Sequence, residues 1–542
     1  MRKQSKHPFG FVNEPMLDFS QLETRLAIDE SLREVHDLYG KIYPLILGTE
    51  EMTTRELFLR PNPSFLNERV GYVCMGGKED VDRAIRLAHR GQPLWGAKTM
   101  RERGDILLRA AELMRQKRMF FIALMMIEVG KGRGDADGEV AEAIEFLDYY
   151  GRCAPWLQHI AQSTVVQVAG EENTWEYLPL GVGASIQPWN FPLSLSVGPT
   201  AAALVMGNAV IYKPASHSAI TGYYMVKLLR EAGVPPDALH YLPCPGSTVG
   251  NYLISHFGID FVAFTGSEEV GNDMEYAFAL CNNNTRALPP HQQHKKKVAV
   301  IEMGGKGFII VDSDADIDEA VVGVSNSAFS FQGQKCSACT RVIVIDDVYD
   351  EFVRRLSERV ASITIGSPEN AKNMMGPMVS REHYDNVRKY MELAEREGTV
   401  LARGTVSEEL KNQGYFLPPM LVGNVHKDAR IAQEEIFGPV LAVFRAKTFA
   451  EAIDLANYTK YGLTGGVYSR DPQHLALARQ ALQVGNLYIN RKITGAVVGC
   501  QPFGGMKMSG NGTKAGGWDY LLNFATRKAI CENTVRRGVA VK

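Results

Sequence analysis

The segment Phe331–Arg341 reads Phe-Gln-Gly-Gln-Lys-Cys-Ser-Ala-Cys-Thr-Arg. Its first cysteine, Cys336, has small and polar neighbours, whereas a cysteine that only packs in a core more often has apolar ones. The glycines predict a tight turn that opens a helix, where the helix dipole and free N–H groups would favour the thiolate. The charge of Lys335 would act in the same direction. Most cysteines of large enzymes are inert, so this pattern alone makes Cys336 only a candidate nucleophile.

A second segment upstream, Val298–Lys306, reads Val-Ala-Val-Ile-Glu-Met-Gly-Gly-Lys. Its four apolar residues predict a buried strand, and Glu302 follows them directly. Burial would raise the pKa of this carboxyl toward the value that a general base needs. The alternative interpretations are an edge glutamate with a partner and an inert buried thiol at Cys336. The pairing resembles the aldehyde dehydrogenase superfamily, in which the glutamate precedes Gly-Gly-Lys and the cysteine follows Gly-Gln-x.

Composition excludes several classes of protein. The 542 residues suggest two or more domains. The 59 Lys and Arg residues are balanced by 61 Asp and Glu residues, so no net positive charge attracts nucleic acid or an anionic membrane. The longest apolar run, residues 120–127, is too short to span a membrane, and no apolar run follows the basic N-terminus as in a secretory signal. Eight scattered cysteines fit a reducing compartment, so we expect a cytoplasmic protein, or a mitochondrial matrix protein in a eukaryote.

Cys336 and Cys339 also have the spacing of a zinc or redox motif. A structural zinc site would need a second pair, and no other two cysteines lie close together in the sequence. A thioredoxin-like motif would lie near the start of a small βαβ unit. We therefore expect no metal and interpret Cys339 as a bystander that could trap Cys336 as a disulfide under oxidation.

The order of elements predicts an α/β protein. From Gly181 onward short apolar strands alternate with helices, and a second such series follows Cys336, which predicts two doubly wound domains with a cleft between them. We expect an NAD-binding, Rossmann-like domain at residues 1–160 and 181–300. A catalytic domain is expected at residues 301–519, and a small β oligomerisation element at residues 161–180 and 520–542. In the last element Val165–Val168 and Trp175–Tyr177 are expected to form a hairpin, and Cys281–Lys297 an exposed loop.

Several motifs suggest a dinucleotide site, although no Gly-x-Gly-x-x-Gly follows a predicted strand. Gly266 and Ser267 join a strand to a helix start, a geometry that cradles phosphate, and Lys213 ends another strand, where a surface lysine is the alternative. In the superfamily the equivalents of Glu435 and Phe437 contact the nicotinamide ribose and ring. The cofactor residues expected in this way are Ile186, Pro188, Trp189, Lys213, Ser216, Gly266, Ser267, Gly271, Glu435 and Phe437.

Cofactor choice depends on Ser216. Many NAD-specific relatives have an acidic residue at this position, which repels the 2′-phosphate of NADP. A serine carries no charge, and His217 beside it could add a partial positive one. We therefore expect NAD to be the cofactor, with NADP also accepted.

The sequence Pro188-Trp189-Asn190-Phe191-Pro192 carries a lone amide. Asn190 could donate an N–H to an oxyanion, with the backbone N–H of Cys336 as a second donor. A turn-capping asparagine is the alternative. The superfamily places an asparagine in this motif in the oxyanion role.

Within the superfamily, Phe331–Arg341, Gly462–Arg470, Gly485–Ala496 and Gln501–Gly505 look like the L-glutamate γ-semialdehyde dehydrogenases. These enzymes, also called 1-pyrroline-5-carboxylate dehydrogenases, catalyse the second step of proline catabolism. The resemblance implies that two phenylalanines pack on the substrate methylenes and that a Gly-Ala turn and a hydroxyl hold its α-carboxylate. The residues are Phe191, Phe503, Gly495, Ala496 and Ser337. Such a turn can form an anion nest, and a plain loop is the alternative.

The mechanism implied by the resemblance begins with attack of the Cys336 thiolate on the aldehyde. Hydride then passes to NAD, and Glu302 activates water to hydrolyse the thioester to glutamate. The alternatives are an aldehyde dehydrogenase for another semialdehyde, a CoA-acylating relative, which would lack Glu302, and a non-catalytic binding protein on the same fold. Beyond the small-molecule substrate, the expected partners are further copies of the chain, as a homodimer or larger, with a transient proline dehydrogenase partner as a further possibility.

Overall fold

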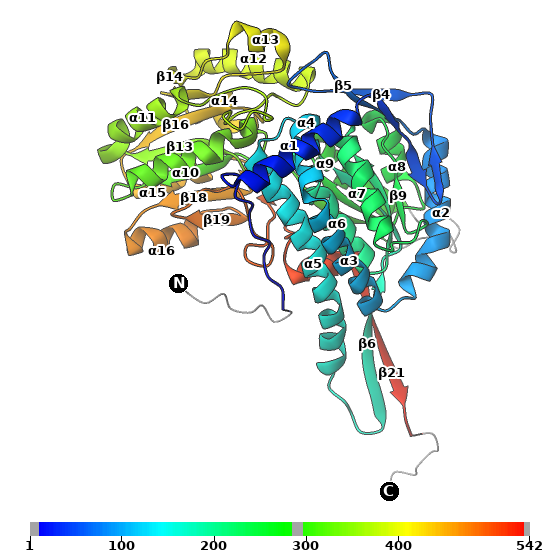
Figure 1. The fold of residues 1–542 in the computed structure, drawn as a ribbon. Coiled ribbons are helices and arrows are strands. Elements are labelled where there is room, and N and C mark those ends of the chain that lie inside the picture. Colours follow the sequence, from blue (N-terminus) through cyan, green and yellow to red (C-terminus); the bar gives the residue numbers. More distant parts are fainter. Residues whose placement is uncertain (1–9, 285–295, 536–542) are drawn as a thin grey trace.

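The computed structural model describes residues 10–284 and 296–535, which form two lobes, each built on a seven-stranded sheet (Figure 1). We call them the N-terminal and the C-terminal lobe. The sheet of the N-terminal lobe has the order β11-β10-β7-β8-β9-β2-β3. From β11 to β9 neighbouring strands are parallel, and β2 and β3 add an antiparallel edge. In sheet order the strands are Val298–Glu302, Phe261–Thr265, Val182–Gln187, Ala209–Pro214, Leu239–Tyr241, Leu45–Leu47 and Glu50–Met52.

Helices cover both faces of this sheet, which explains why its central strands are apolar along their whole length. On β8, Val210 and Tyr212 pack into one core, and Ala209 and Ile211 into the opposite one. The first core holds helices α3 to α7, and the second holds α2, α8 and α9. These helices are Met100–Gln116, Arg118–Glu128, Arg133–Ser163, Ser194–Val205 and Ala219–Glu231, then Lys78–Gly96, Asn251–Ser255 and Glu268–Asn284.

The sheet of the C-terminal lobe has the order β14-β15-β16-β13-β12-β18-β19, with all neighbours parallel except β14. Its strands are Thr399–Arg403, Met420–Gly423, Val440–Ala446, Cys339–Ile345, Gly307–Val311, Thr464–Tyr468 and Asn486–Ile489. Helices α10 and α11 pack on one face, and α12, α15 and α16 on the other. They are Ile317–Phe329, Asp346–Ala361, Arg381–Glu397, Phe449–Asn457 and Pro472–Ala481.

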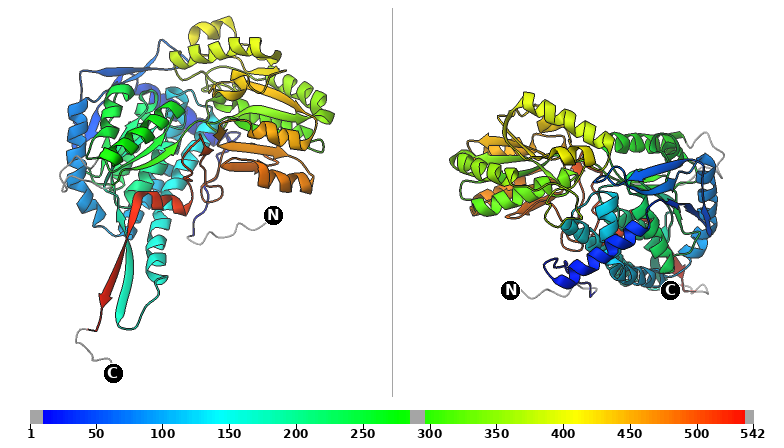
Figure 2. Two further views of the ribbon diagram at one scale, coloured as in Figure 1. Left: turned by 180° about the vertical axis from the view of Figure 1, so that it is seen from behind. Right: turned by 45° about the horizontal axis from the view of Figure 1, so that its top comes forward.

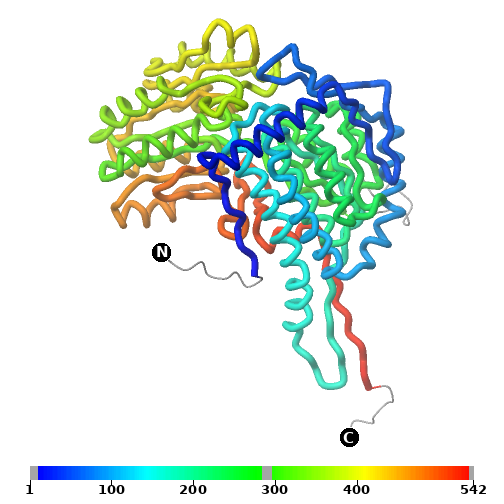
Figure 3. Tube along the Cα trace, in the orientation of Figure 1, coloured from blue at the N-terminus to red at the C-terminus, as the bar shows by residue number. Residues whose placement is uncertain are grey.

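The N-terminal part crosses the first lobe. Helix α1, the dark blue coil in Figure 3, lies across this lobe and against α4. A small sheet of order β1-β5-β4 follows it. These elements are Leu22–Asp37, Lys41–Tyr43, Arg69–Cys74 and Leu57–Pro61. None of the described helices has the length and apolar character needed to cross a membrane.

A two-stranded ribbon projects from the N-terminal lobe beside the end of α5 (Figures 1 and 2). Strand β6, Glu171–Pro179, pairs antiparallel with β21, Ala525–Asn533. The hairpin predicted within residues 165–177 is therefore wrong, because residues 165–168 form no strand and the partner comes from the far end of the chain. A local pattern shows that a strand forms but does not show its partner.

The loop predicted for Cys281–Lys297 is only partly tested. Residues 281–284 belong to α9, so the helix continues further than expected. The middle of the predicted loop, residues 285–295, lies outside the described residues.

Candidate active site

The turn that carries Cys336 joins a short 3-10 segment, Ser330–Gly333, to strand β13. A strand follows the cysteine, so the prediction that this turn opens a helix is wrong. The backbone before it is unusual, since Phe331 and Gln332 have φ of 47° and 58°. The amide of Gln332 fixes this conformation by donating to the carbonyl oxygens of Pro377 at 2.6 Å and Gly130 at 3.1 Å. Such left-handed residues are costly and persist where surrounding contacts hold them.

The environment of Cys336 favours the thiol over the thiolate. Burial raises its pKa to about 12, and the charges of Glu435 and Glu302 act in the same direction. Lys335 does not provide the expected compensation, because its Nζ lies 2.8 Å from Asp135 Oδ1 and 2.9 Å from Ser330 Oγ. The partly exposed side chain remains accessible to a ligand. A cation placed next to the sulfur would be needed to lower this pKa.

Glu302 ends β11 and is packed among glycines. Its Oε2 accepts a hydrogen bond of 2.8 Å from the Gly505 N–H, whereas its buried Oε1 has no partner among the described residues. A Cβ on Gly504 or Gly510 would lie 2.8 or 2.9 Å from Oε1, so only glycine leaves room for the carboxyl there. Burial raises the pKa of Glu302 well above its usual value. One oxygen is therefore fixed and the other is available, as a general base requires.

Asn190 is almost fully buried, and it contacts the turn of Cys336. Its Nδ2 donates to the carbonyl oxygen of Gln334, two residues before the cysteine, at 3.1 Å. The amide thus lies beside the nucleophile turn, although the two segments are far apart in the sequence. This position agrees with a donor to an oxyanion on the substrate.

Lys131 and Glu139 form a fully buried ion pair behind Asn190. The Lys131 Nζ donates to the Asn190 carbonyl oxygen at 2.7 Å and lies 3.8 Å from the centroid of the Phe191 ring. Glu139 Oε1 accepts from the N–H groups of Leu193 at 2.7 Å and Ser194 at 3.2 Å, where α6 begins. One ion pair therefore holds Asn190, Phe191 and the start of α6 together.

The segment predicted to bind the substrate carboxylate lies beside cationic side chains. Gly495 has φ of +79°, and its carbonyl oxygen accepts from Arg491 Nη2 at 3.0 Å. A Cβ on Gly495 would lie 3.8 Å from Lys492 Cε. Burial acts to raise the pKa of Asp135, but the charges of three lysines outweigh it and lower that pKa: Lys335, Lys131 and Lys492. Lys131 and Lys335 are paired with Glu139 and Asp135, so Lys492, which makes no ion pair among the described residues, supplies the remaining positive charge near this loop.

Two other predicted substrate residues lie in well-defined backbone positions. Ser337 directly follows the nucleophile, and its carbonyl oxygen accepts from Thr464 Oγ1 at 3.2 Å. Phe503 pairs with Ala515 through two backbone hydrogen bonds of 2.8 Å and immediately precedes the glycines that pack on Glu302. Ala496 is partly exposed beside Gly495.

The predicted cofactor residues of the N-terminal lobe gather at the carboxyl ends of its parallel strands. Lys213 is buried near the end of β8, and its one side-chain hydrogen bond within the described residues is a long one, 3.4 Å, to the Pro214 carbonyl oxygen. A buried ammonium with so few contacts fits a ligand hydroxyl or phosphate. Ile186 lies near the end of β7, and Pro188 and Trp189 follow that strand.

The glycine turn after β10 leads into α9. Gly266 and Ser267 precede the helix, so its N-terminal N–H groups face the end of the strand, as a phosphate site requires. Gly271 has a packing role as well, because a Cβ there would lie 2.5 Å from Met303 Sδ. Ser216 opens a short 3-10 segment after β8. The positive charge suggested for His217 is wrong, since burial lowers its pKa to about 3.

Aromatic side chains continue the site into the C-terminal lobe. The Trp189 ring meets Phe437 and His383 edge to face, with centroids 5.5 and 4.8 Å apart. Glu435 Oε1 accepts from the Gly305 N–H at 2.9 Å, and burial raises the pKa of this carboxyl to about 7. Glu435 lies near the nucleophile, because its charge also acts on Cys336.

A sequence model of the aldehyde dehydrogenase family matches residues 51–530. A 1-pyrroline-5-carboxylate dehydrogenase of Geobacillus sp. (strain WCH70) is 41% identical over 522 residues, 96% of this chain and 99% of that protein. A solved structure, 1-pyrroline-5-carboxylate dehydrogenase from Thermus with bound NAD, has a TM-score of 0.91 at 43% identity, covering 96% of this chain and 99% of that one. Proline utilization A (PutA) from Bdellovibrio bacteriovorus matches with a TM-score of 0.93 at 42% identity, over 99% of this chain and 55% of that one. The chain belongs to the aldehyde dehydrogenase family.

The family and the α/β fold class predicted from the sequence are thereby confirmed. The roles of individual residues in this aldehyde dehydrogenase remain predictions, as do the domain boundaries. No group of three or more His, Cys, Asp or Glu side chains in the described parts of the chain is arranged to hold a metal ion. Cys339 is a free thiol buried at the start of β13.

Sequence reasoning missed several residues of this aldehyde dehydrogenase site. Lys131 has a sequence signal, since it lies between two glycines, three residues after the apolar helix α4 ends, with Glu139 eight residues later. Lys306, the lysine of the Gly-Gly-Lys motif, is also buried. Its Nζ donates to the Glu434 carbonyl oxygen at 2.6 Å, and burial lowers its pKa to about 7. His383 had no sequence signal, because its neighbour Trp189 is distant in the chain.

Proposed function

We propose that this aldehyde dehydrogenase oxidises L-glutamate γ-semialdehyde, the hydrated open form of 1-pyrroline-5-carboxylate, to L-glutamate with NAD. The observation that carries the proposal is the arrangement at Glu302, a buried carboxyl with one fixed and one unpaired oxygen whose charge acts on Cys336. The near full-length similarity to proteins named 1-pyrroline-5-carboxylate dehydrogenase supports the choice of substrate.

In this proposal Cys336 attacks the aldehyde carbon and forms a thiohemiacetal. Asn190 and the Cys336 backbone N–H donate to its oxyanion. Loss of hydride leaves a thioester on the sulfur, and Glu302 takes a proton from the water that hydrolyses it. A base with a raised pKa suits this step, because it accepts the proton near neutral pH.

The cofactor would lie along the carboxyl ends of β7, β8 and β10. Lys213 would hold a ribose hydroxyl, the turn at Gly266 and Ser267 the phosphates, and Glu435 and Phe437 the nicotinamide end. Bound NAD supplies the hydride acceptor and a cationic ring. The chain itself provides a buried, poorly paired ammonium and a helix start that fit these groups.

The substrate carboxylate would lie at Gly495, Ala496 and Ser337, with Phe191 and Phe503 on its methylenes. Arg491 and Lys492 lie beside Gly495 and make no ion pair among the described residues, so their positive charge favours a substrate that carries an anionic group. This charge argues against an aldehyde dehydrogenase for a neutral aldehyde.

We also propose that the β6–β21 ribbon mediates a homodimer or larger assembly, because its projecting strand edges are otherwise a liability. A sedimentation mass of one 60.0 kDa chain at micromolar concentration would exclude this. We further propose that a proline dehydrogenase is a transient partner, which the match to proline utilization A supports. The proposed location is the cytoplasm.

The activity is tested by following NADH formation with 1-pyrroline-5-carboxylate and a panel of other semialdehydes. We expect the first substrate to have the highest kcat/KM, Cys336→Ala to be inactive and Cys339→Ala to stay active. Higher kcat/KM for another semialdehyde would support the alternative aldehyde dehydrogenase function. Loss of activity in Cys339→Ala but not in Cys336→Ala would show that the wrong thiol was assigned.

A further inference from the structure

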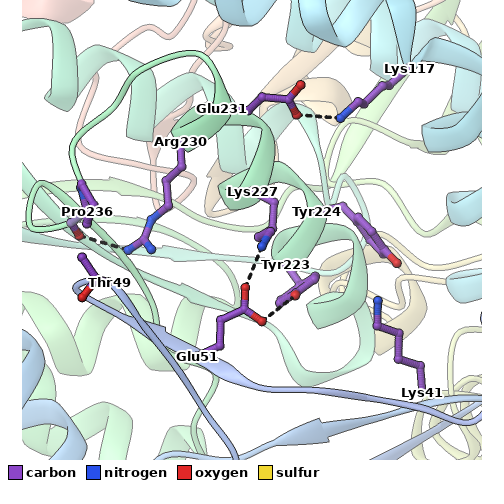
Figure 4. Close-up of a pocket in the computed structure, with 10 residues that line it drawn as sticks. All are labelled: Lys41, Thr49, Glu51, Lys117, Tyr223, Tyr224, Lys227, Arg230, Glu231 and Pro236. Carbon is purple, nitrogen blue, oxygen red and sulfur yellow. Dashed lines mark hydrogen bonds and ion pairs between the residues drawn. The ribbon is translucent and has the colours of Figure 1, made fainter.

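A pocket of about 650 Å³ opens on the N-terminal lobe, and none of its lining residues belongs to the active site. Its walls come from α7, β1, β3 and the end of α3 (Figure 4). Four of the lining side chains are cations and two are carboxylates, so the pocket has excess positive charge. Two tyrosines of α7 complete its wall.

Both carboxylates are already engaged by side chains of the pocket. Glu51 lies between Lys227 Nζ, at 2.6 Å, and the Tyr223 hydroxyl, at 3.1 Å (Figure 4). Glu231 pairs with Lys117 at 2.8 Å. The four charged side chains of these ion pairs are about half exposed, with 41–51% of their side-chain surface accessible. Such pairs are weakly held, so their lysines can turn toward a stronger anion.

Lys41 supplies a further positive charge, which acts on Glu51 from a distance without forming an ion pair with it. Among the described residues it makes no ion pair, and its ammonium lies over three tyrosine rings, 5.5, 5.9 and 5.6 Å from the centroids of Tyr43, Tyr223 and Tyr224. Aromatic faces hold a cation in place without cancelling its charge. Lys41 therefore presents a positioned charge at this pocket.

Arg230 adds a second positioned cation to the pocket. Its Nη2 donates to the carbonyl oxygens of Pro236 at 3.0 Å and Leu239 at 2.6 Å, which fixes the guanidinium. Its Nε is buried and has no partner among the described residues. Because Nε has almost no accessible surface, a ligand in the pocket would interact with the charge of the fixed guanidinium rather than with Nε itself.

We propose that this pocket binds a small multivalent oxyanion, contacted by Lys41 and Arg230 and by the lysines of the two exposed ion pairs. Phosphoryl and carboxylate groups both satisfy this chemistry, since each presents several acceptor oxygens to ammonium and guanidinium donors. The size of the pocket suits a metabolite rather than a single inorganic ion. The site is separate from the reaction centre, so its occupant would act on the protein as a regulator or stabiliser.

The test is calorimetric titration of the full chain with pyrophosphate and with citrate, at constant ionic strength and saturating NAD. NAD is included so that pyrophosphate does not enter the cofactor site. The variants are Lys41→Gln, the conservative Lys41→Arg and a control, Lys411→Gln, on the distant helix α13, Glu408–Gln413. We expect saturable binding of at least one probe, weakened about tenfold by Lys41→Gln and retained in Lys41→Arg and the control.

The probe that binds more tightly identifies the ligand as phosphoryl-bearing or carboxylate-bearing. Lys41→Gln should leave kcat and KM for NAD unchanged without the probe, which shows that the variant is folded. Absence of saturable binding of both probes would overturn the proposal. Equal affinity in wild type and Lys41→Gln would overturn it as well, because the anion would then bind elsewhere.

Discussion

Replacing Lys131 by methionine tests whether the buried ion pair with Glu139 holds the active site together. Removal of Lys131 leaves the Glu139 carboxylate buried without its partner, which typically costs about 3–5 kcal/mol. At about 2–4 °C per kcal/mol for a unit of 150–250 residues, the first thermal transition should fall by about 6–20 °C. The double variant Lys131→Met/Glu139→Gln should recover most of this loss, because the glutamine oxygen still accepts from the N–H groups at the start of α6.

The loss of stability in Lys131→Met should depend on pH. Without the lysine, burial keeps the folded-state pKa of Glu139 above its unfolded value, so the folded protein binds the additional proton. A carboxyl whose pKa is raised by folding contributes its full stability at low pH, where it is protonated. This contribution is lost as the pH rises toward the pKa of the group in the folded state. The deficit relative to wild type should therefore be smaller at pH 5.5 than at pH 8, as measured by thermal unfolding in matched buffers.

Activity separates this role from simple stabilisation. Lys131 contacts Asn190 and Phe191, so Lys131→Met should lower kcat/KM at temperatures far below its unfolding. Arg118→Met is the matched control, since it breaks another buried ion pair, with Asp137, away from these residues. It should lower stability and leave kcat/KM near wild type. A deficit independent of pH, or a double variant as unstable as the single one, would refute this reasoning.

Three further predictions concern the reaction itself. In the absence of cofactor, the rate of Cys336 alkylation, measured by mass spectrometry, should rise about tenfold per pH unit from pH 7 to 10, because the pKa of the thiol is about 12. A plateau of this rate below pH 9 would contradict the raised pKa. Glu302→Gln should give a burst of NADH followed by a slow phase in stopped-flow measurements; a slow first turnover without a burst would exclude a role in deacylation. Ser216→Glu should lower kcat/KM for NADP relative to NAD by on the order of tenfold. If wild type does not use NADP, or the ratio is unchanged, Ser216 does not face the 2′ position.

Local sequence was sufficient where a short pattern forms its own structure. The apolar run Val298–Ile301 became β11, and Glu302 lies at its end with the raised pKa that burial predicts. The turn at Gly266 and Ser267 joins β10 to α9 as expected, because strand, glycine and helix start are adjacent in the chain. The alternation of strands and helices likewise predicted two parallel sheets, since strands joined by helices lie parallel.

The sequence by itself therefore determined the class of fold and the residue types available for chemistry. Tertiary structure alone decided what depends on distant segments. Strand β6 pairs with β21, Lys131 reaches Asn190, and the Cys336 pKa rises because folding buries the thiol near Glu435 and Glu302. The last two depend on burial and on charges brought together by folding, and the first depends on backbone hydrogen bonds between distant strands. All three require distances through space that no short stretch of sequence contains.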